Sequence, residues 1–383
     1  MKRKVCVVVA SRANYGRVKF LMNAILKNPS LELQLILGAS TLLDRFGKAI
    51  EIIKADGFSP NRSIHYVIEG ETLTTQAKST GLGIVELSSA FQDMEPDMVV
   101  TVADRFETMA TAIASTYLNI PLVHLQGGEV SGNIDDRVRN AITKLADFHF
   151  VASDEALLRV VNMGEAPHRV FNYGCPSMDI LANTDLSLLS AKLDNYLGVG
   201  RRIDWKRPYI LVLQHPVTTS YGSGRQQITE TLEAVSRMQE LQKIVLWPNV
   251  DAGSDDVSKG IRQFRESRMQ EPFYYVKNFS PEDYARVLNH ACCCVGNSSS
   301  FIREGAFLGV PAVLVGDRQK GREHGANAKF ADYDRNEIER TLRQQIEHGR
   351  YPADKRFGHG DAGVRIAAEL ASMVLDLAPR DKL

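Results

Sequence analysis

The stretch Val5–Gly16, VCVVVASRANYG, starts the pattern that decides the fold. A run of six apolar, valine-rich residues is typical of a buried strand, and the polar turn after it leads into a helical pattern. Comparable short runs recur along the chain, with longer helical patterns between them. This alternation predicts parallel sheets covered by helices on both faces, so we expect an α/β protein.

The predicted strands form two sets, separated where the alternation pauses after Gly174-Cys175-Pro176. The first set comprises Val5–Ala10, Leu33–Leu37, Ile64–Ile68, Met98–Val102, Leu122–Leu125, Phe148–Ala152 and Val170–Tyr173. The second set comprises Tyr209–Leu213, Ile244–Trp247, Phe273–Val276, Cys292–Val295 and Ala312–Val315. We therefore predict two doubly wound, Rossmann-like domains, residues 1–180 and 181–383, that face a central cleft.

Helical patterns fill the gaps between these runs. They include Arg17–Leu26, Leu42–Ala55 and Asp135–Ala146. The terminal pattern, Ala362–Leu377, is amphipathic and could pack against either domain.

The composition excludes several classes of partner. The 383 residues carry 46 Lys and Arg against 46 Asp and Glu, so the formal net charge is zero. Nucleic-acid-binding proteins usually show a basic excess. The first apolar run, about six residues long, is too short for a signal-peptide core or a membrane span. We expect a cytoplasmic protein that binds neither nucleic acid nor membrane, and that meets any anionic ligand with local groups.

The cysteines indicate a reducing compartment. There are five, Cys6, Cys175 and the run Cys292-Cys293-Cys294, an odd number without C-x-x-C spacing. This pattern argues against a disulfide framework and a structural zinc site, and it favours buried free thiols. No other spacing indicates a metal, and the turn after the first strand lacks the G-x-G-x-x-G of dinucleotide sites. We therefore expect no metal and no cofactor.

Polar residues follow the first and fourth predicted strands, and open α/β sheets bind ligands at the carboxyl ends of their strands. The guanidinium of Arg12, after the first strand, suits a phosphate, although it could instead pair with a surface carboxylate. Asp104 follows the fourth strand, with Arg105 beside it. Asp104 could act as a base or cap the helix behind it, and Arg105 is a candidate substrate contact.

The segment after the next strand, His124–Arg139, reads HLQGGEVSGNIDDRVR. Its glycines form a turn that costs folding entropy, and its amide, carboxylate and hydroxyl groups are hard to explain by structure alone. Asp135 and Arg139 lie four residues apart on one face of a predicted helix, so a paired carboxylate is available near the helix start. Favourable interaction with the helix dipole is the alternative explanation for Asp135 or Asp136.

Two strands of the second set end in groups suited to a phosphate. The imidazole of His215 follows Tyr209–Leu213 and could protonate or hydrogen-bond a leaving phosphate, unless it is a structural histidine. Ser298 and Ser299 follow the Cys292–Val295 strand at the start of a helix. Backbone amides and hydroxyls form an anion site there, although serine capping is the alternative.

Two further polar residues lie close by in the sequence. Glu304, one to two turns into that helix, could accept hydrogen bonds from a ribose, and Arg318 supplies another cation to the same edge. Together these groups predict a site for a nucleoside diphosphate, but they do not define a reaction.

Seven motifs, in order along nearly the whole chain, resemble those of the hydrolysing UDP-N-acetylglucosamine 2-epimerases, a family that includes bacterial enzymes of sialic and legionaminic acid synthesis. They are SRANY (11–15), ADRFE (103–107), HLQGGEVSGNIDD (124–136), LQHPVTT (213–219), WPNVDAGS (247–254), GNSSSFIREGAFLGVP (296–311) and GDRQKGRE (316–323). The resemblance implies the GT-B fold, an NDP-linked N-acetylhexosamine substrate and a homodimer or homotetramer. It also implies two stages: UDP leaves as the C2 proton is removed, and water then adds to the 2-acetamidoglucal to release the free 2-epimer.

The resemblance also assigns roles to individual residues. Asp104 and Asp135 match the family's catalytic carboxylates. The residues that resemble diphosphate contacts are Arg12, His215, Ser298, Ser299 and Arg318. Glu304 resembles the ribose contact, and Phe279 lies in a segment similar to the region that binds the base.

Three positions depart from the family pattern, all of them in the first domain. The family's histidine-x-glutamate is His124-Leu125-Gln126 here, so an amide replaces a carboxylate usually counted as catalytic. Gln126 can position a sugar hydroxyl or a water but cannot accept a proton, and Glu129 is the nearby carboxylate considered for its place. Asn140 and Thr41 stand where the family often has histidines. We therefore expect secure nucleotide binding together with a modified sugar, for instance a 2,4-diacetamido-6-deoxy hexose, or an altered activity.

Three other functions stay open. A GT-B glycosyltransferase shares the fold and the diphosphate site, but it requires an acceptor and does not need the carboxylates of GGEVSGNIDD. A non-hydrolysing epimerase returns UDP-N-acetylmannosamine, and its first-domain motifs differ more from these. Gln126 makes a sugar-nucleotide sensor conceivable, whereas Asp104, Asp135 and His215 disfavour it.

Overall fold

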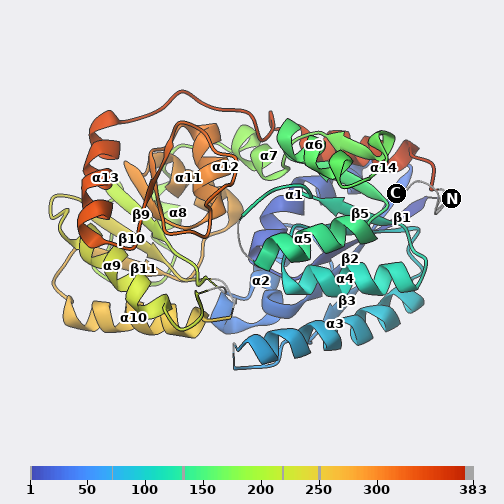
Figure 1. Cartoon of the computed structure of the whole chain (residues 1–383), viewed down its shortest axis with the longest axis horizontal. Helices are drawn as coiled ribbons and strands as arrows, with labels where there is room; N and C mark the ends of the chain where they lie inside the picture. Colours follow the sequence, from blue (N-terminus) through green and yellow to red (C-terminus); the bar gives the residue numbers. More distant parts are fainter. Residues whose placement is uncertain (1, 71, 132–133, 218–219, 249–251, 376–383) are drawn as a thin grey trace. The chain divides into compact units, whose positions relative to one another are not determined.

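The chain forms two α/β units (Figure 1). Unit 1 comprises Met1–Val130, Ile134–Asn183 and Arg356–Leu383, and unit 2 consists mainly of Thr184–Lys355. The computed structural model describes residues 2–70, 72–131, 134–217, 220–248 and 252–375. Among these residues, no helix combines the length and the apolar character that crossing a bilayer requires. The α/β class predicted from the sequence is confirmed in both units.

The sheet of unit 1 has seven parallel strands in the order β3-β2-β1-β4-β5-β6-β7. The strands are β1 (Arg3–Val9), β2 (Leu31–Gly38), β3 (Arg62–Ile64), β4 (Met98–Val102), β5 (Leu122–Leu125), β6 (Phe148–Val151) and β7 (Val170–Asn172). The strand order reverses between β1 and β4. That reversal is the topological switch point, where sheets of this kind bind ligands.

Helices cover both faces of this sheet. They are α1 (Arg12–Lys27), α2 (Ala49–Ala55), α3 (Leu73–Met94), α4 (Phe106–Tyr117), α5 (Ile134–Leu145), α6 (Asp154–Asn162), α7 (Ser177–Asn183) and α14 (Ala362–Ser372). Val5 and Val7 of β1 point into a core that α1 and α14 complete, whereas Cys6 and Val8 point into a second core that α3 and α4 complete. A strand buried on both faces needs an unbroken apolar run, which is why the sequence pattern was clear here.

The C-terminal helix α14 packs on α1 and therefore belongs to unit 1 (Figure 1). The buried carboxylate of Asp179 accepts hydrogen bonds from the backbone amides of Ala362, at 3.0 Å, and Gly363, at 2.6 Å, where α14 begins. Burial raises the pKa of Asp179 to about 6, against the effect of these hydrogen bonds. The segment that begins at Arg356 thus belongs to unit 1. The sequence assigned residues 181–383 to the second domain and left open that the terminal helix packs against the first.

The sheet of unit 2 has seven strands in the order β14-β13-β12-β9-β10-β11-β8. The strands are β8 (Gly198–Gly200), β9 (Tyr209–Leu213), β10 (Gln242–Leu246), β11 (Phe273–Val276), β12 (Cys293–Gly296), β13 (Ala312–Val315) and β14 (Ala328–Ala331). All pairs are parallel except the edge pair of β8 with β11, so the sheet is mixed rather than wholly parallel. Its switch point lies between β9 and β12.

The helices of unit 2 include some that the sequence pattern did not predict. They are α8 (Ser190–Leu193), α9 (Gly224–Ser236), α10 (Ser254–Ser267), α11 (Pro281–His290), α12 (Ser299–Leu308) and α13 (Arg335–His348). The polar helix α13 and the edge strands β8 and β14 were missed. β14 buries only its first and last residues, and β8 consists of one valine between two glycines, so neither shows an apolar run.

Helix α1 begins at Arg12, five residues earlier than predicted. Ser11 caps the helix, because its side chain accepts a hydrogen bond from the Asn14 amide at 3.2 Å. Arg12 therefore occupies the first turn of the helix rather than a turn before it.

The predicted helix Leu42–Ala55 is shorter in the structure. Two 3₁₀ turns, η1 (Ala39–Leu42) and η2 (Asp44–Phe46), come first, and α2 follows only at Ala49. Gly47, with φ of +85°, ends the second turn in a left-handed conformation that an α-helix cannot continue. The helix is interrupted at that glycine.

Gly296, the last residue of β12, has no room for a side chain. Its φ is +134°, and a Cβ atom would collide with the Leu213 carbonyl oxygen of the neighbouring strand β9. We predict that Gly296→Ala lowers the free energy of unfolding of unit 2 by about 3 kcal/mol, because the two strands have to separate. Both tryptophans, Trp205 and Trp247, lie in unit 2, so urea unfolding followed by tryptophan fluorescence measures this change.

The matched control is Gly81→Ala in helix α3 of unit 1. A Cβ atom at Gly81 meets no heavy atom within 4 Å. This variant should leave the tryptophan transition unchanged. A Gly296→Ala transition that coincides with that of the wild type would contradict the close approach of β9 and β12.

Candidate functional site

Four of the predicted site residues directly follow the strands at the switch points of the two sheets. In unit 1, Arg12 follows β1 and Asp104 follows β4, which are neighbouring strands. In unit 2, His215 follows β9 and Ser298 follows β12, which are also neighbours. Since open α/β sheets bind ligands outside the carboxyl ends of their strands at such points, each unit presents one group of candidate residues.

Asp104 is held by an arginine. The Nη2 of Arg139, on α5, donates a hydrogen bond to the Asp104 carboxylate, whose side chain is 15 % exposed. The residue that caps α4 is Arg105, and its side chain makes no capping hydrogen bond. The interpretation of Asp104 as a helix cap is therefore wrong, and its carboxylate is part of a partly buried ion pair.

Arg139 gathers oxygen atoms from three segments. Besides Asp104, its Nη1 donates to the Asp136 carboxylate at 2.6 Å and to the Glu129 carbonyl oxygen at 2.5 Å. Burial alone would lower the pKa of Arg139, but Asp104, Glu129 and Asp136 outweigh burial and raise it. The guanidinium thus stays charged although it is fully buried.

A second helical carboxylate takes part in this ion pair. Arg139 is bound to Asp136, three residues before it on α5. Asp135 lies half-buried in the first turn of α5. Its catalytic role stays a prediction.

Gln126 is buried just after β5 in an unusual backbone conformation. Its φ is +65°, and its side chain is 2 % exposed. The amide Nε2 donates to the Sγ of Cys175 at 2.6 Å. A thiol from the loop before α7 therefore orients the amide that stands where the family usually has a carboxylate.

Glu129 shares the cation that holds Asp104. The residue is 8 % exposed, and its charge contributes to the raised pKa of Arg139. Arg139 thus contacts two segments of unit 1: the loop after β5, which carries Glu129, and the turn after β4, which carries Asp104.

Arg105 is bound to a buried carboxylate of its own helix. Its Nε and Nη2 each donate to Glu107 at 3.1 Å, and Glu107 is fully buried. This bidentate pair fixes the guanidinium next to the turn that carries Asp104. The substrate contacts expected of Arg105 and of Arg12 stay predictions.

Asn297 joins the two strands that meet at the switch point of unit 2. Its Oδ1 accepts a hydrogen bond from the His215 amide at 2.7 Å, and its Nδ2 donates to the His215 carbonyl oxygen at 2.9 Å. Asn297 is 1 % exposed, so the pair is sealed from water. The backbone on which the His215 imidazole sits is therefore fixed from both sides.

The backbone of Asn297 also anchors the segment that carries Arg318. Its carbonyl oxygen accepts hydrogen bonds from Arg318 Nη1 at 3.3 Å and from Gln319 Nε2 at 2.9 Å. Gln319 in turn accepts from Arg322 Nη1 at 2.9 Å. His215, Ser298 and Arg318 are thus connected through one buried asparagine.

The serines after β12 form a network of hydroxyl groups. Ser298 caps α12 and accepts a hydrogen bond from the Ser300 amide at 3.3 Å. The Ser298 and Ser300 hydroxyls are 2.8 Å apart, and Tyr284 Oη lies 2.5 Å from Ser300 Oγ. Ser299 accepts a hydrogen bond from buried Arg303 at 3.0 Å. The capping role considered for Ser298 is therefore present, and the amides of this helix start remain suited to an anion.

Glu304 offers an acceptor with no partner in the described part of the chain. Its Oε2 is buried and makes no hydrogen bond there. An unbonded carboxylate oxygen is costly to bury, and the hydroxyl of a ligand would satisfy it. This geometry fits the ribose contact expected of Glu304.

The ring of Phe279 packs inside unit 2. The residue is 3 % exposed, and its ring meets that of Tyr196 edge to face, with 4.7 Å between the centroids. The expected contact with the base would have to use the little of Phe279 that stays accessible. It stays a prediction.

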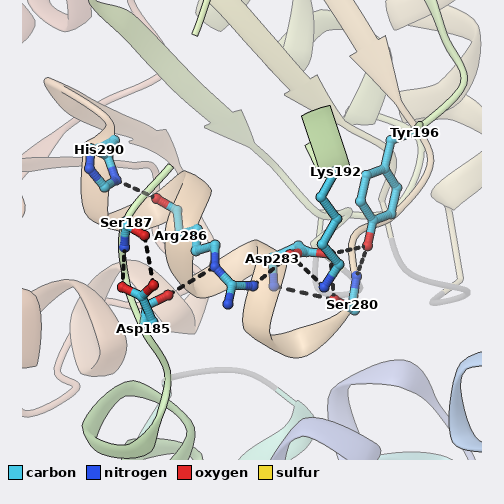
Figure 2. A network of polar contacts seen from close by, with 8 residues as sticks. All are labelled: Asp185, Ser187, Lys192, Tyr196, Ser280, Asp283, Arg286 and His290. Atoms are coloured by element: carbon cyan, nitrogen blue, oxygen red, sulfur yellow. Dashed lines mark hydrogen bonds and ion pairs between the residues drawn. The ribbon is translucent and has the colours of Figure 1, made fainter. Parts of the chain in front are cut away.

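The turn that carries Phe279 is fixed by the network around Asp283 (Figure 2). The fully buried Asp283 accepts hydrogen bonds from Tyr196 Oη at 2.7 Å and Ser280 Oγ at 2.9 Å. It also pairs with Lys192 at 3.2 Å and Arg286 at 2.7 Å. Burial would raise the pKa of Asp283, but the bonds from Tyr196, Ser280 and Lys192 outweigh burial and lower it. This network ties the segment before β8 to α11.

Sequence reasoning missed the groups that hold the site together. The sequence assigns no role to His124 or Asn297. Asn297 directly follows β12, so a polar residue at the end of a buried strand was the available signal for it. His124 lies inside β5 and Arg139 inside α5, where no such signal exists.

Three parts of the expected motifs lie outside the described residues. They are Gly132-Asn133, Thr218-Thr219 and Asn249-Val250-Asp251. Within the described residues, no three His, Cys, Asp or Glu side chains gather as a metal site would require.

The sequence is similar to those of known UDP-N-acetylglucosamine 2-epimerases. The family model described as UDP-N-acetylglucosamine 2-epimerase matches residues 23–371. A UDP-N-acetylglucosamine 2-epimerase of Neisseria meningitidis serogroup B is 30 % identical over 94 % of this chain and 92 % of its own. A UDP-N,N'-diacetylbacillosamine 2-epimerase (hydrolyzing) of Legionella pneumophila is 29 % identical over 95 % of this chain and 94 % of its own.

A solved structure shares the fold. The UDP-GlcNAc 2-epimerase from Neisseria meningitidis bound to UDP-GlcNAc superimposes with a TM-score of 0.80 at 16 % identity, over 97 % of this chain and 100 % of that one. The GT-B-like fold expected from the motifs is thereby confirmed. With a family model that spans most of its length, the chain belongs to the UDP-N-acetylglucosamine 2-epimerase family.

Proposed function

We propose that the protein is a hydrolysing 2-epimerase that converts UDP-N-acetylglucosamine and water into free N-acetylmannosamine and UDP. The observation that carries this proposal is the Asp104–Arg139 pair at the switch point of unit 1, where the same guanidinium also donates to the backbone carbonyl oxygen of Glu129. Removing a carbon-bound proton requires a carboxylate held in fixed geometry. The hydrolysing relative from Legionella pneumophila supports the second half of the reaction.

In the first stage, Asp104 removes the proton from C2 while the bond between C1 and the phosphate oxygen breaks. The electron pair of the C2–H bond becomes the C1–C2 double bond of a 2-acetamidoglucal. UDP leaves with the electrons of the C1–O bond. Arg139 keeps Asp104 oriented and ionised, because a buried cation beside a carboxylate stabilises its charge.

In this proposal, unit 2 binds the diphosphate. The amides and hydroxyls at the start of α12, together with Arg318, stabilise the negative charge that develops on the leaving UDP. His215 donates a hydrogen bond or a proton to it. Glu304 accepts from a ribose hydroxyl with its unbonded Oε2.

In the second stage, water adds to C1 of the glucal and a proton returns to C2 from the opposite face. Asp135 and Glu129 are the carboxylates we assign to these transfers. Gln126 cannot take a proton, so its amide, held by Cys175, would orient the water or a sugar hydroxyl.

A second substrate is favoured by the same observation at Gln126. An amide in place of a carboxylate changes what the sugar side can bind, and one relative is named for a diacetamido sugar nucleotide. UDP- or GDP-2,4-diacetamido-2,4,6-trideoxyglucose is therefore the alternative substrate for the same reaction. We further propose that the enzyme works as a homodimer or homotetramer.

The test is incubation in deuterium oxide with UDP-N-acetylglucosamine and, separately, with the UDP- and GDP-linked diacetamido sugars. We expect a free sugar of inverted C2 configuration that carries deuterium at C2, together with the nucleoside diphosphate, measured by NMR. Release of UDP-N-acetylmannosamine would indicate a non-hydrolysing epimerase. Sugar nucleotides that all stay intact would contradict the enzymatic proposal.

Asp104→Asn removes the proposed base but keeps its shape. We predict that kcat falls by about 100-fold or more, the range typical of a lost general base, while UDP affinity changes less than about twofold. Turnover assays and calorimetric titration with UDP measure the two effects. Asp93→Asn, which makes the same change in an exposed ion pair with Arg62 of unit 1, should alter neither. Equal losses of rate and affinity would instead make Asp104 a ligand-holding residue.

Glu304→Ala removes the proposed ribose acceptor. The wild type should bind UDP about 10-fold more tightly than it binds 2′-deoxy- or 3′-deoxy-UDP, as expected for a hydrogen bond to a charged group. In Glu304→Ala this preference should disappear, which competition titrations measure. The exposed Glu347→Ala of α13 should keep it. A preference that survives in Glu304→Ala would assign the ribose to another residue.

A further inference from the structure

We propose that His124 and Thr143 form a positioning pair that sets the direction in which Asp104 points. This inference rests on the proposed function, in which Asp104 acts as the base that removes the C2 proton. It concerns two residues with no role in the reaction described above. His124 lies in β5, and Thr143 lies on α5, one turn after Arg139.

The hydrogen bonds of the ring fix its tautomer. His124 Nε2 lies 2.9 Å from the carbonyl oxygen of Ala103, and an oxygen of this kind can only accept. Nε2 therefore carries the proton. Burial lowers the pKa of His124 to about 3, so the imidazole is neutral and Nδ1 is bare. Nδ1 then accepts a hydrogen bond from the Thr143 hydroxyl, 3.2 Å away.

The group that receives the Nε2 hydrogen bond is under strain. Ala103 has φ of +63°, a left-handed conformation that is unfavourable for a residue with a Cβ atom. Its amide donates to the Leu125 carbonyl oxygen at 2.9 Å, and its carbonyl accepts from His124. Two successive residues of β5 thus clamp Ala103 from both sides. Asp104 is the next residue, so this clamp determines where its carboxylate goes.

Helix α5 supports both parts of the arrangement. Arg139 holds the Asp104 carboxylate directly, and Thr143 holds the ring that clamps Ala103. Residues four apart lie on one face of a helix, so a single helical face sets both contacts. The Asp104 side chain and its backbone turn are therefore positioned together.

The loop after β5 packs against the same pair. A Cβ atom at Gly127 would lie 3.0 Å from Thr143 Oγ1 and 3.1 Å from His124 Nδ1. Only a glycine leaves space for this hydrogen bond without pushing the loop away. The pair thus also sets the path of the loop toward Glu129.

His124 does not act on the substrate itself. It is fully buried, and both ring nitrogens are engaged within unit 1. It is a positioning residue, which acts through Ala103. A change at His124 should therefore alter the rate of the chemical step more than the binding of the nucleotide.

The test compares two amide variants of His124. Gln places its amide nitrogen near the position of Nε2 and can still donate to Ala103, whereas Asn is too short to reach it. We expect His124→Asn to lower kcat by about 10-fold or more with KM and UDP affinity within about twofold, and His124→Gln to keep most of the activity. Backbone hydrogen exchange at Ala103–Arg105 should speed up in His124→Asn and not in His124→Gln.

The matched control is His149→Asn in the neighbouring strand β6. His149 pairs with His124 in register and is equally buried, but it contacts Glu165 at 3.2 Å. Its replacement should lower stability without lowering kcat. If His124→Asn fails to fold, Thr143→Val replaces the hydroxyl with a methyl group and releases the ring that donates to Ala103. It should lower kcat less than is expected of His124→Asn, with unchanged KM, and an unchanged kcat would overturn the positioning role.

The outcomes separate this inference from the proposed function. If the wild type turns over no sugar nucleotide, the function is wrong, and the exchange rates alone then test the clamp. If the wild type is active while His124→Asn matches it in kcat and in exchange at Ala103–Arg105, the positioning role is overturned. A His149→Asn variant as impaired in kcat as His124→Asn would reduce the effect to general destabilisation and would also overturn it.

Discussion

The ion pair between Arg139 and Asp104 is the interaction on which the candidate site of unit 1 depends. A fully buried guanidinium is costly unless acceptors surround it, and here they come from Asp104, Asp136 and the Glu129 carbonyl. Each acceptor belongs to a different segment, so the cation fixes three segments at once. The turn after β4, the loop after β5 and the start of α5 therefore adopt their positions together.

In unit 2 a neutral side chain, that of Asn297, connects the segments of the candidate site. Asn297 supplies one donor and one acceptor to the His215 backbone, and its carbonyl anchors Arg318. Backbone amides and hydroxyls at the helix start beside it suit an anion. The diphosphate site that we propose is thus built from local groups, in a chain whose formal net charge is zero.

Much of this architecture was predictable from the sequence, because strands buried on both faces need continuous apolar runs. Those of β1, β4, β5 and β9 were clear, and Asp104 and His215 were identified by the strands that they follow. β14 was not predictable, because it buries only its two end residues. The partner of Arg139 was not predictable either, because Asp104 lies 35 residues away and reaches it only through the packing of α5. The same holds for Asn297 and His215, which lie 82 residues apart.

The account holds that the reaction takes place at C1 and C2 of the sugar, while the phosphates only leave. Turnover of UDP-N-acetylglucosamine in water enriched in oxygen-18 tests this most directly, with the released UDP analysed by mass spectrometry. Elimination across C1 and C2 breaks the bond between carbon and oxygen, so the account predicts UDP without the heavy isotope. UDP that carries one oxygen-18 would show that water attacks phosphorus, and it would contradict a mechanism that begins at Asp104.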